Sequence, residues 1–504
     1  MSVILVNDLT FAYDGSYDNI FEHVSFRLDT DWRLGLIGRN GRGKTTLLRL
    51  LMGQYEYNGS IVSPVTFDYF PFAVENRERE TWEVAMEINP ELELWQLQKE
   101  ISRLEVKEET LYRPFFTLSQ GEQTKVLLAV CFLRENAFLL IDEPTNHLDR
   151  EARKVLGDYL RTKKGFLLVS HDRQLLDICV DHVLSFNREG IKVSQGNFTT
   201  WNENRERRDR HELAENERLK KDIRRLEAAA RQAHAWADRT ESLKIGSGYA
   251  DRAYLGEQSR RMQSRRKNLE KRQRAAIEEK SSLLKNVETA ERLKLYPLTH
   301  HKEVLASFEQ ADLGYGDRIV SRNLSFSVRQ GERIALQGRN GCGKSTVLRA
   351  LLEAASRAQE TEEREESAGE ALLKQGEIRL APGLKISYVS QDTSGLKGSL
   401  TDYIESCQAD RTLFLALLRK LDFSRVQFEK RMEDYSEGQK KKVLIARSLC
   451  EPSHLYIWDE PLNYVDVFSR MQIEELILSC RMTLLFVEHD QAFCDKIATR
   501  VIRL

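Results

Sequence analysis

The sequence predicts an α/β fold in which one type of domain is built twice, and three observations lead to this prediction. Several short motifs occur in the same order in both halves of the chain. In each half, the first motif lies between an apolar stretch typical of a strand and a stretch with helical periodicity. The segment between the two copies contains no proline and has the apolar spacing of paired helices. A chain of 504 residues, 41% of them hydrophobic, is long enough for roughly two to four domains.

Composition narrows the class of protein. Lys and Arg (77) nearly balance Asp and Glu (78), so any surface that binds nucleic acid must be local. The seven cysteines are scattered singly, without a Cys-x-x-Cys pair, which predicts free thiols in a reducing compartment. The apolar stretches fall short of the roughly 18–20 residues that span a bilayer. We therefore expect a cytoplasmic protein with no transmembrane domain of its own.

A glycine-rich motif follows the apolar stretch 34–37 and recurs at an offset of 300 residues. Its strand–loop–helix context is typical of a phosphate-binding loop, in which backbone N–H groups at a helix N-terminus bind phosphates. The lysine of such a loop supplies positive charge to the β- and γ-phosphates, and the next hydroxyl can ligate Mg²⁺. The predicted phosphate-binding residues are Gly38, Asn40, Gly41, Gly43, Lys44, Thr45 and Thr46 in the first copy, and Gly338, Asn340, Gly341, Gly343, Lys344, Ser345 and Thr346 in the second.

An Asp-Glu pair ends an apolar strand pattern in each copy, as Asp142-Glu143 and Asp459-Glu460. The carboxyl edge of a parallel sheet is where Mg²⁺ sits beside a phosphate-binding loop. The glutamate that follows can orient or deprotonate a water for attack on the γ-phosphate. We therefore predict Asp142 and Asp459 as metal-binding and Glu143 and Glu460 as catalytic.

Two further motifs recur in the same order. Ser119-Gln-Gly121-Glu and Ser436-Glu-Gly438-Gln each read as a capping box that opens a helix, and their duplication ahead of the Asp-Glu pair favours a helix N-terminus that faces phosphate. His171 and His489 each follow a strand pattern and precede aspartate. A histidine there is usually a satisfied polar group, but its recurrence favours a contact with the γ-phosphate.

The segment 201–296 joins the two copies and differs from them in composition. It holds 25 Lys and Arg against 17 Asp and Glu, a net charge of +8, whereas the rest of the chain carries −9. Apolar residues recur at heptad spacing over 219–237 and again over 255–276, which predicts an antiparallel helical hairpin with a tip near 236–255. The alternative is a charged coiled coil that only spaces two domains. We expect domain boundaries at 1–200, 201–296 and 297–504, with an acidic insertion at 353–376 that forms a solvated loop or frayed helix.

Together these motifs resemble ATP-binding-cassette ATPases, and two cassettes on one chain, without membrane spans and joined by a charged hairpin, resemble the ABC-F family. The resemblance covers about 400 of the 504 residues. It implies an α/β fold of two P-loop ATP-binding-cassette domains, each with a small antiparallel β part and a helical subdomain, joined by a long antiparallel α-helical hairpin. It also implies a monomer that hydrolyses ATP with Mg²⁺.

The resemblance implies two composite sites in a head-to-tail sandwich of the cassettes. The first site combines Lys44, Thr45, Asp142, Glu143 and His171 with Ser436 and Gly438. The second combines Lys344, Ser345, Gln391, Asp459, Glu460 and His489 with Ser119 and Gly121. Thr45, Asp142, Ser345, Gln391 and Asp459 would ligate Mg²⁺, and Asp149 and Asp466 would be carboxylates of the loop that follows the Asp-Glu pair. Tyr13 and Tyr315 would stack on adenine, the alternative being edge-strand aromatics.

The two copies are not equivalent. The second contains Gln391, which matches the family's Mg²⁺-contacting glutamine, whereas the aligned position of the first is Phe72. Phe72 cannot ligate a metal or position water, so we expect slower or differently coupled turnover at the first site. The second copy also has Tyr435 where the family has leucine, and it departs from the family pattern between Leu462 and Asp466.

ABC-F proteins bind the exit (E) site of the ribosome, and their hairpin reaches toward the peptidyl-transferase centre. The basic hairpin of this chain suits that role, because Lys and Arg bind RNA phosphates. The expected partners are the ribosome, through large-subunit rRNA and P-site tRNA, with no membrane and no DNA. The candidate tip residues are Lys244, Ile245, Tyr249, Arg252 and Tyr254.

A compact first cassette, a long hairpin and Phe72 make the chain most similar to the branch that protects ribosomes from lincosamides, streptogramin A and pleuromutilins. The resulting prediction is an ATP-dependent ribosome-protection factor. The alternatives are a housekeeping translation factor that relieves stalled ribosomes, the ATPase subunit of a membrane transporter, and a DNA-repair ATPase. The fused cassettes and the polar hairpin disfavour the transporter, and the position of the coil between two complete cassettes disfavours DNA repair.

Overall fold

The computed structural model describes residues 2–13, 19–72, 74–145, 148–187, 190–242, 293, 295–316, 318–339, 341–359 and 372–504. The chain divides into two compact units, one formed by residues 1–201 together with 292–504 and the other by residues 202–291. The first unit contains both repeats, which are called the first repeat (residues 1–200) and the second repeat (residues 297–504) below.

The first repeat is built on two sheets. The smaller is antiparallel in the order β2-β1-β4, with β1 (Val3–Phe11), β2 (Phe21–Asp29) and β4 (Asn58–Val62). The larger has the order β5-β6-β7-β3-β8-β9, and only β9 pairs antiparallel. Its strands are β3 (Arg33–Ile37), β5 (Thr66–Phe70), β6 (Ala137–Asp142), β7 (Phe166–Val169), β8 (His182–Asn187) and β9 (Gly190–Gln195). The four apolar residues of β7 are all buried, as expected for a central parallel strand that is covered on both faces.

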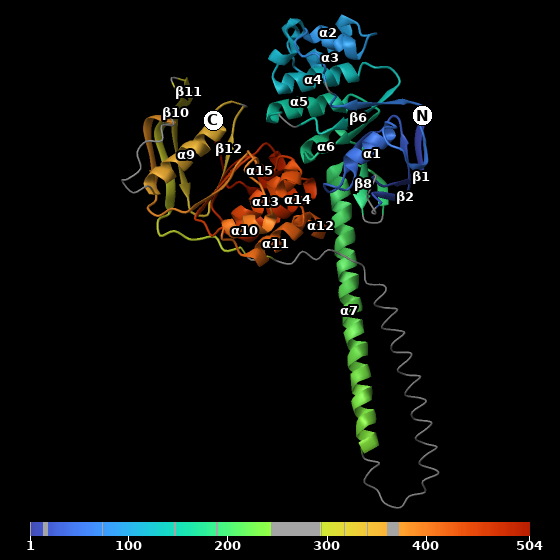
Figure 1. Cartoon of the computed structure of the whole chain (residues 1–504), viewed down its shortest axis with the longest axis vertical. Helices are drawn as coiled ribbons and strands as arrows, with labels where there is room; N and C mark the ends of the chain where they lie inside the picture. The colour runs from blue at the N-terminus through green and yellow to red at the C-terminus, as the bar shows by residue number, and fades with distance from the viewer. Residues whose placement is uncertain are drawn as a thin grey trace, which may run out of the picture. The chain divides into compact units, whose positions relative to one another are not determined.

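Helices cover this sheet and form a separate helical part (Figure 1). The helix α1 (Lys44–Leu51) follows the first glycine loop, and α5 (Arg150–Arg161) and α6 (Arg173–Cys179) follow β6 and β7. The helical part contains α2 (Thr81–Ile88), α3 (Leu94–Arg103), α4 (Gln120–Cys131) and the 3₁₀ turns Glu108–Tyr112 and Phe115–Thr117. Leu97, Ile101 and Leu104 recur along one face of α3 and are fully buried, so their helical spacing builds this core.

The second repeat has the same plan. Its antiparallel sheet has the order β11-β10-β13, with β10 (Val304–Tyr315), β11 (Arg318–Arg329) and β13 (Leu373–Leu380). Its parallel sheet has the order β14-β15-β16-β12-β17, with β12 (Arg333–Gln337), β14 (Ile386–Val389), β15 (Leu455–Asp459), β16 (Leu484–Val487) and β17 (Arg500–Arg503). The helices are α9 (Lys344–Gln359), α10 (Leu400–Ser406), α11 (Arg411–Lys420), α12 (Arg425–Phe428), α13 (Glu437–Cys450), α14 (Val467–Ser479) and α15 (Gln491–Ile497), with a 3₁₀ turn at Met432–Asp434. The predicted α/β fold, built twice, is thereby confirmed.

The linker and the acidic insertion are described only in part. Helix α7 (Phe198–Ser242) contains the first predicted helix of the linker, whereas the returning helix and the tip residues Lys244, Ile245, Tyr249, Arg252 and Tyr254 lie outside the described residues. The acidic insertion predicted over 353–376 as a loop or frayed helix is ordered at both ends. Helix α9 continues to Gln359, with an Arg357–Glu353 ion pair one turn apart, and β13 begins at Leu373. Residues 360–371 of the insertion lie outside the described residues.

Candidate nucleotide sites

Both glycine loops adopt the conformation that a phosphate-binding loop requires. Gly41 and Gly43 have φ of 78° and 88°, and Gly341 and Gly343 have φ of 81° and 99°. Residues other than glycine rarely adopt such positive φ values. A Cβ added at Gly41 or at Gly341 would meet no atom within 4 Å, so the backbone there faces open space where a phosphate fits. Asn340, predicted to bind there, lies outside the described residues.

The loop lysines lie inside the loops. Lys44 Nζ donates hydrogen bonds to Gly38 O (2.7 Å), Arg39 O (3.2 Å) and Asn40 Oδ1 (3.1 Å). Lys344 Nζ donates to the backbone oxygens of Gly338 (2.8 Å) and Arg339 (3.0 Å). Burial lowers the pKa of Lys44, although carboxylates nearby oppose that shift. A buried ammonium bonded to neutral oxygens is a strong site for an anion.

A hydroxyl–carboxylate pair lies beside each loop. Thr45 Oγ1 donates to Asp142 Oδ2 and Ser345 Oγ donates to Asp459 Oδ1, both at 3.1 Å. Burial raises the pKa of both aspartates, which indicates carboxylates held with little solvent. Hydroxyl and carboxylate oxygens are the hard donors that Mg²⁺ prefers, so these residues fit the ion that the sequence predicted there.

The two predicted catalytic glutamates share an unusual backbone. Glu143 and Glu460 have φ of 50° and 47°, in the left-handed region that non-glycine residues rarely adopt. Each backbone N–H donates to the neighbouring strand, at Val169 O (2.9 Å) and Val487 O (3.0 Å). His171 Nε2 lies 3.5 Å from Glu143 Oε1, and His489 Nε2 lies 3.3 Å from Glu460 Oε1. The structure thus places each predicted histidine beside the predicted glutamate of its own repeat.

The environments of the two glutamates differ. Burial, followed by the charge of Asp142, raises the pKa of Glu143 to about 8, and its buried Oε1 has no hydrogen-bond partner within the described part of the chain. Burial also acts on Glu460, but His489 and Asn463 outweigh it and hold its pKa below the usual value. Gln391 Nε2 (2.8 Å) and Asn463 Nδ2 (2.7 Å) both donate to Glu460 Oε2. In the first repeat, Phe72 instead packs against the apolar core.

Tyr13 and Tyr315 lie at the first turn of the helix that follows each loop. Tyr13 Oη is 2.8 Å from Thr46 Oγ1, and Tyr315 Oη accepts from Thr346 Oγ1 at 3.5 Å. Both rings are half-exposed, at 42% and 44%. Each ring therefore stands at the edge of a phosphate-binding loop with an accessible face, a position compatible with stacking on adenine.

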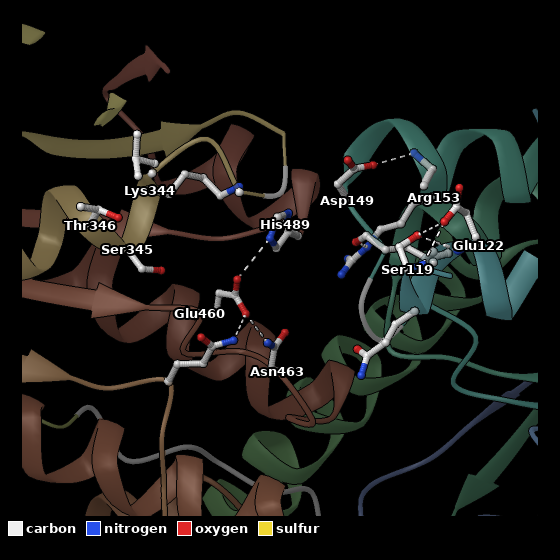
Figure 2. A pocket seen from close by; sticks show the side chains of 18 of the residues that line it. Ser119, Glu122, Asp149, Arg153, Lys344, Ser345, Thr346, Glu460, Asn463 and His489 are labelled. Atoms are coloured by element: carbon white, nitrogen blue, oxygen red, sulfur yellow. Dashed lines mark hydrogen bonds and ion pairs between the residues drawn. The ribbon is translucent and has the colours of Figure 1, made fainter. Parts of the chain in front are cut away.

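A cavity of about 1190 Å³ joins the Lys344 loop to the first repeat. Figure 2 shows Lys344, Glu460 and His489 on one side of it, with Ser119 and Glu122 facing them. Ser119 and Gly121 line the cavity as the sequence predicted. The capping box named as the alternative is also present, because Glu122 N donates to Ser119 Oγ (3.2 Å) and Ser119 N donates to Glu122 Oε2 (2.9 Å).

The Lys44 loop meets the corresponding motif of the second repeat directly. Asn40 Nδ2 donates to Tyr464 O at 2.9 Å, and a Cβ added to Gly438 would lie 3.1 Å from Asn40 Nδ2. Ser436 caps α13 and accepts from Gln439 N at 3.3 Å. The glycine at position 438 is required because the same Cβ would come within 2.3 Å of Tyr464 O.

Some residues of the sites escaped sequence reasoning. Tyr69 Oη donates to Asp142 Oδ2 at 3.2 Å, and burial raises the pKa of Tyr69 to about 12. Lys442 Nζ donates to the buried Asp466 at 2.7 Å, and this charge counteracts burial and lowers the pKa of Asp466. Tyr69 precedes Phe72 in a stretch that aligns with 388–391, so its position at the end of a strand could have predicted that it lies near Asp142. Lys442 gave no signal, because it lies within an ordinary helical pattern.

The sites therefore have the make-up of a P-loop ATPase that carries two nucleotide-binding regions. The sequence model of the family described as "ABC transporter" matches residues 21–146 and 321–463. The chain belongs to this ATP-binding-cassette family, with two cassettes in tandem, and its relatives place it among the ABC-F proteins. It is accordingly an ATPase. None of the helices within the described residues has both the length and the apolar character of a membrane span.

Similar proteins cover nearly the whole chain. "Ribosome protection protein VmlR" of Bacillus subtilis is 26% identical over 96% of this chain and 84% of its own length. "ATP-binding protein Uup" of Caulobacter vibrioides is 27% identical over 100% of this chain and 77% of its own length. A solved chain from the complex of archaeal ribosomal stalk protein aP1 and ribosome recycling factor aABCE1 superposes with a TM-score of 0.61. At 19% identity over 98% of this chain and 87% of that one, the last likeness shows the fold alone.

Proposed function

We propose that this ATPase is a ribosome-protection factor of the cytoplasm. In this proposal it binds the E site of the ribosome with ATP, places the linker tip near the peptidyl-transferase centre and dislodges antibiotics, and ATP hydrolysis releases it. The observation that carries the proposal is the likeness to the Bacillus subtilis "Ribosome protection protein VmlR" along 96% of the chain, linker included.

The linker supports an RNA partner. Within the described part of α7, the basic side chains of Arg207, Arg208, Arg218 and those of 220–225 are mostly exposed, whereas Leu219, Ile223 and Leu226 are half-buried. Exposed arginine and lysine along a helix bind RNA phosphates without reading sequence. We therefore propose large-subunit rRNA and P-site tRNA as the partners of the linker, with Lys244, Ile245, Tyr249, Arg252 and Tyr254 at its tip.

The residues of the nucleotide sites support ATP as the ligand that controls binding of the protein to the ribosome. Lys44 and Lys344 bind the β- and γ-phosphates, and Tyr13 and Tyr315 stack on the adenines. Glu143 and Glu460 accept a proton from the attacking water, and His171 and His489 hold the γ-phosphate side of the site. Thr45 with Asp142, and Ser345 with Asp459 and Gln391, would hold Mg²⁺, which when bound neutralises charge on the phosphates.

Two measurements test the proposal. The Glu143→Gln/Glu460→Gln double variant, which binds but does not hydrolyse ATP, should sediment with ribosomes in ATP and not without nucleotide. Purified wild-type protein with ATP should restore cell-free translation that a lincosamide or pleuromutilin inhibits. Replacing 242–252 by a short glycine linker should abolish the rescue while ATPase activity is retained.

The outcomes separate the alternatives. If the double variant binds ATP but does not sediment with ribosomes, the ribosomal role is wrong. If it sediments but the protein changes translation only in drug-free reactions, the protein is a housekeeping translation factor. Co-purification with a membrane protein, and none with ribosomes, would indicate a transporter subunit.

A further inference from the structure

The two cassettes meet at two interfaces that the repeat relates to each other. The Lys44 interface joins the first glycine loop and α6 to the second cassette. The Lys344 interface joins the second glycine loop and α15 to the first cassette. Since the motifs align at offsets of 317 residues at the Asp-Glu pair and 318 at the histidine, each residue of one interface has a definable counterpart in the other. The counterpart residues differ in charge, burial and apolar character between the two interfaces.

A buried ion pair crosses the Lys44 interface. Arg173, the first residue of α6 and two residues after His171, donates both terminal nitrogens to Glu474 of α14, one of them at 3.3 Å. The side chain of Arg173 is 10% exposed and that of Glu474 is 0% exposed. Asp490 lies 3.6 Å from the same guanidinium and accepts from Arg470 at 2.9 Å, and Lys496 donates to Glu474 at 3.0 Å, so each acidic side chain has cationic neighbours. Removing either partner would leave a buried charge, which costs far more than a surface pair contributes.

The counterpart residues cannot form this pair. Gln491 occupies the position of Arg173 in the second cassette, and its amide bonds Asp495 within α15. Gly157 occupies the position of Glu474, and a Cβ there would lie 3.2 Å from Ile178. The ion pair is therefore possible at one interface only, as a consequence of the sequence itself.

Apolar contacts show the same one-sidedness. Val467, Phe468 and Met471 at the start of α14 pack into the core of the first cassette, and Phe468 contacts the Trp201 ring at 6.0 Å between centroids. Their counterparts at the start of α5 are Arg150, Glu151 and Lys154, all exposed. These three charged residues line a cavity of about 880 Å³ together with Gln491, Gln337 and one face of α6. Apolar burial thus stabilises one interface, while charged residues beside a cavity occupy the equivalent positions of the other.

The loop contacts follow the same division. Arg39 pairs with Asp422 at the Lys44 interface, where their side chains are 21% and 23% exposed. Arg339, the counterpart of Arg39, pairs with Glu151, and those side chains are 78% and 71% exposed. Exposed pairs of this kind contribute little to stability and are screened by salt.

We propose that the Lys44 interface stays closed throughout the ATPase cycle, with Arg173 and Glu474 as positioning residues that hold it, and that only the Lys344 interface opens and closes. Arg173 acts through its neighbour His171, because fixing the start of α6 against α14 fixes the histidine beside Glu143. The Lys344 interface, which has a large cavity and exposed pairs, closes when ATP bridges its loop to Ser119 and Gly121. This proposal rests on the ATPase activity of the family and is independent of ribosome binding.

Hydrogen–deuterium exchange of the full-length Glu143→Gln/Glu460→Gln protein, with and without ATP, tests the motion. The first-turn amides of a helix have no backbone partners within the helix, and in α5, α6, α14 and α15 the N-cap aspartate accepts from one of them. Exchange of the other first-turn amides therefore reports on what covers them. The first turn of α14 should exchange slowly in both states, whereas those of α5 and α15 should slow by about tenfold on ATP binding. Equal ATP-dependent protection at both interfaces, or larger protection at α14, would overturn the proposal.

Site-specific turnover tests the two positioning residues. With Glu460→Gln as background, so that only the Lys44 site turns over, Arg173→Gln should lower kcat about tenfold and leave KM for ATP within about twofold, because Arg173 does not touch the nucleotide. With Glu143→Gln as background the same substitution should change neither constant, and Arg173→Lys should recover part of the loss. Gln491→Ala, at the counterpart position, serves as the control.

A double variant separates positioning from loss of folding. Arg173→Gln/Glu474→Gln removes the buried carboxylate that Arg173→Gln leaves with only the half-exposed Lys496 as partner. It should therefore melt closer to the parent than Arg173→Gln does, yet show the same low kcat and an ATP-dependent first turn of α14. If the double variant keeps the parental kcat and exchange, or if Arg173→Gln lowers turnover equally in both backgrounds, the proposal is wrong.

Discussion

The nucleotide sites of the first and second cassettes share every phosphate-binding motif and differ in what surrounds the glutamate. In the second cassette Gln391 and Asn463 both bond Glu460 and orient its carboxylate, and Asn146, at the position equivalent to Asn463, lies outside the described residues. In the first, Phe72 packs against the core, and burial, followed by the charge of Asp142, raises the pKa of Glu143 to about 8. The duplicated glycine loops thus have the same geometry in both cassettes, whereas the neighbours of the two proposed bases, Glu143 and Glu460, shift their pKa values in opposite directions.

The largest expected effect comes from removing each base in turn. Glu460→Gln should lower steady-state ATPase activity about a thousandfold, because an oriented general base contributes that order of rate. Glu143→Gln should lower it by less than about fivefold, since we expect the Lys44 site to turn over slowly in the parent protein. Phosphate release at saturating ATP measures the activity of both variants. Equal losses of activity would show that the two sites contribute equally to turnover.

A second comparison concerns the aspartates that begin α5 and α14. Lys442→Met leaves Asp466 buried without its partner, which should lower the free energy of unfolding by about 3 kcal/mol. Lys125→Met, at the counterpart position, should cost less than about 1 kcal/mol, because Lys125 is half-buried and acts on Asp149 only at a distance. Thermal melts of the two variants at low and high salt give the values. A larger loss for Lys125→Met would show that Lys125 stabilises the start of α5 more than Lys442 stabilises the start of α14.

The missing glutamine offers a gain of function. With Glu460→Gln as background, Phe72→Gln should raise turnover at the Lys44 site about tenfold, since an amide there could orient Glu143 as Gln391 orients Glu460. Phe72→Leu, which keeps the position apolar, is the matched control and should not raise turnover. If both variants behave alike, the identity of residue 72 does not explain the difference between the sites.

The smallest expected effect concerns Tyr69. The Tyr69 hydroxyl donates a hydrogen bond to Asp142. For its counterpart Tyr388, burial and the charge of Asp459 raise the pKa. Tyr69→Phe should lower turnover at the Lys44 site about threefold, because one hydrogen bond to a charged group is removed. Tyr388→Phe should change turnover at the Lys344 site by less. Single-turnover assays in the two glutamine backgrounds compare the variants directly.

The motif residues could be predicted from the sequence because they occur in short motifs that are present in both cassettes. The strand–loop–helix context of Lys44 and the strand ends at Asp142 and Asp459 followed from periodicity, and the α/β fold built twice was confirmed. The pair Arg173–Glu474 could not be predicted, because its partners lie 301 positions apart and each looks like an ordinary helix residue. Gly157 at the position of Glu474 and Gln491 at the position of Arg173 differ in sequence, but the packing of the two cassettes was needed to show what these differences do.

The left-handed backbone at Glu143 and Glu460 has a consequence for anyone who stabilises this protein. A non-glycine residue held there costs about 1 kcal/mol relative to glycine, so substitution by glycine should favour the folded state while it removes the base. Selection for thermal tolerance alone would therefore drift toward loss of hydrolysis at these two positions. Persistence of glutamate at both of them in a laboratory population would report that turnover, and not merely ATP binding, is under selection.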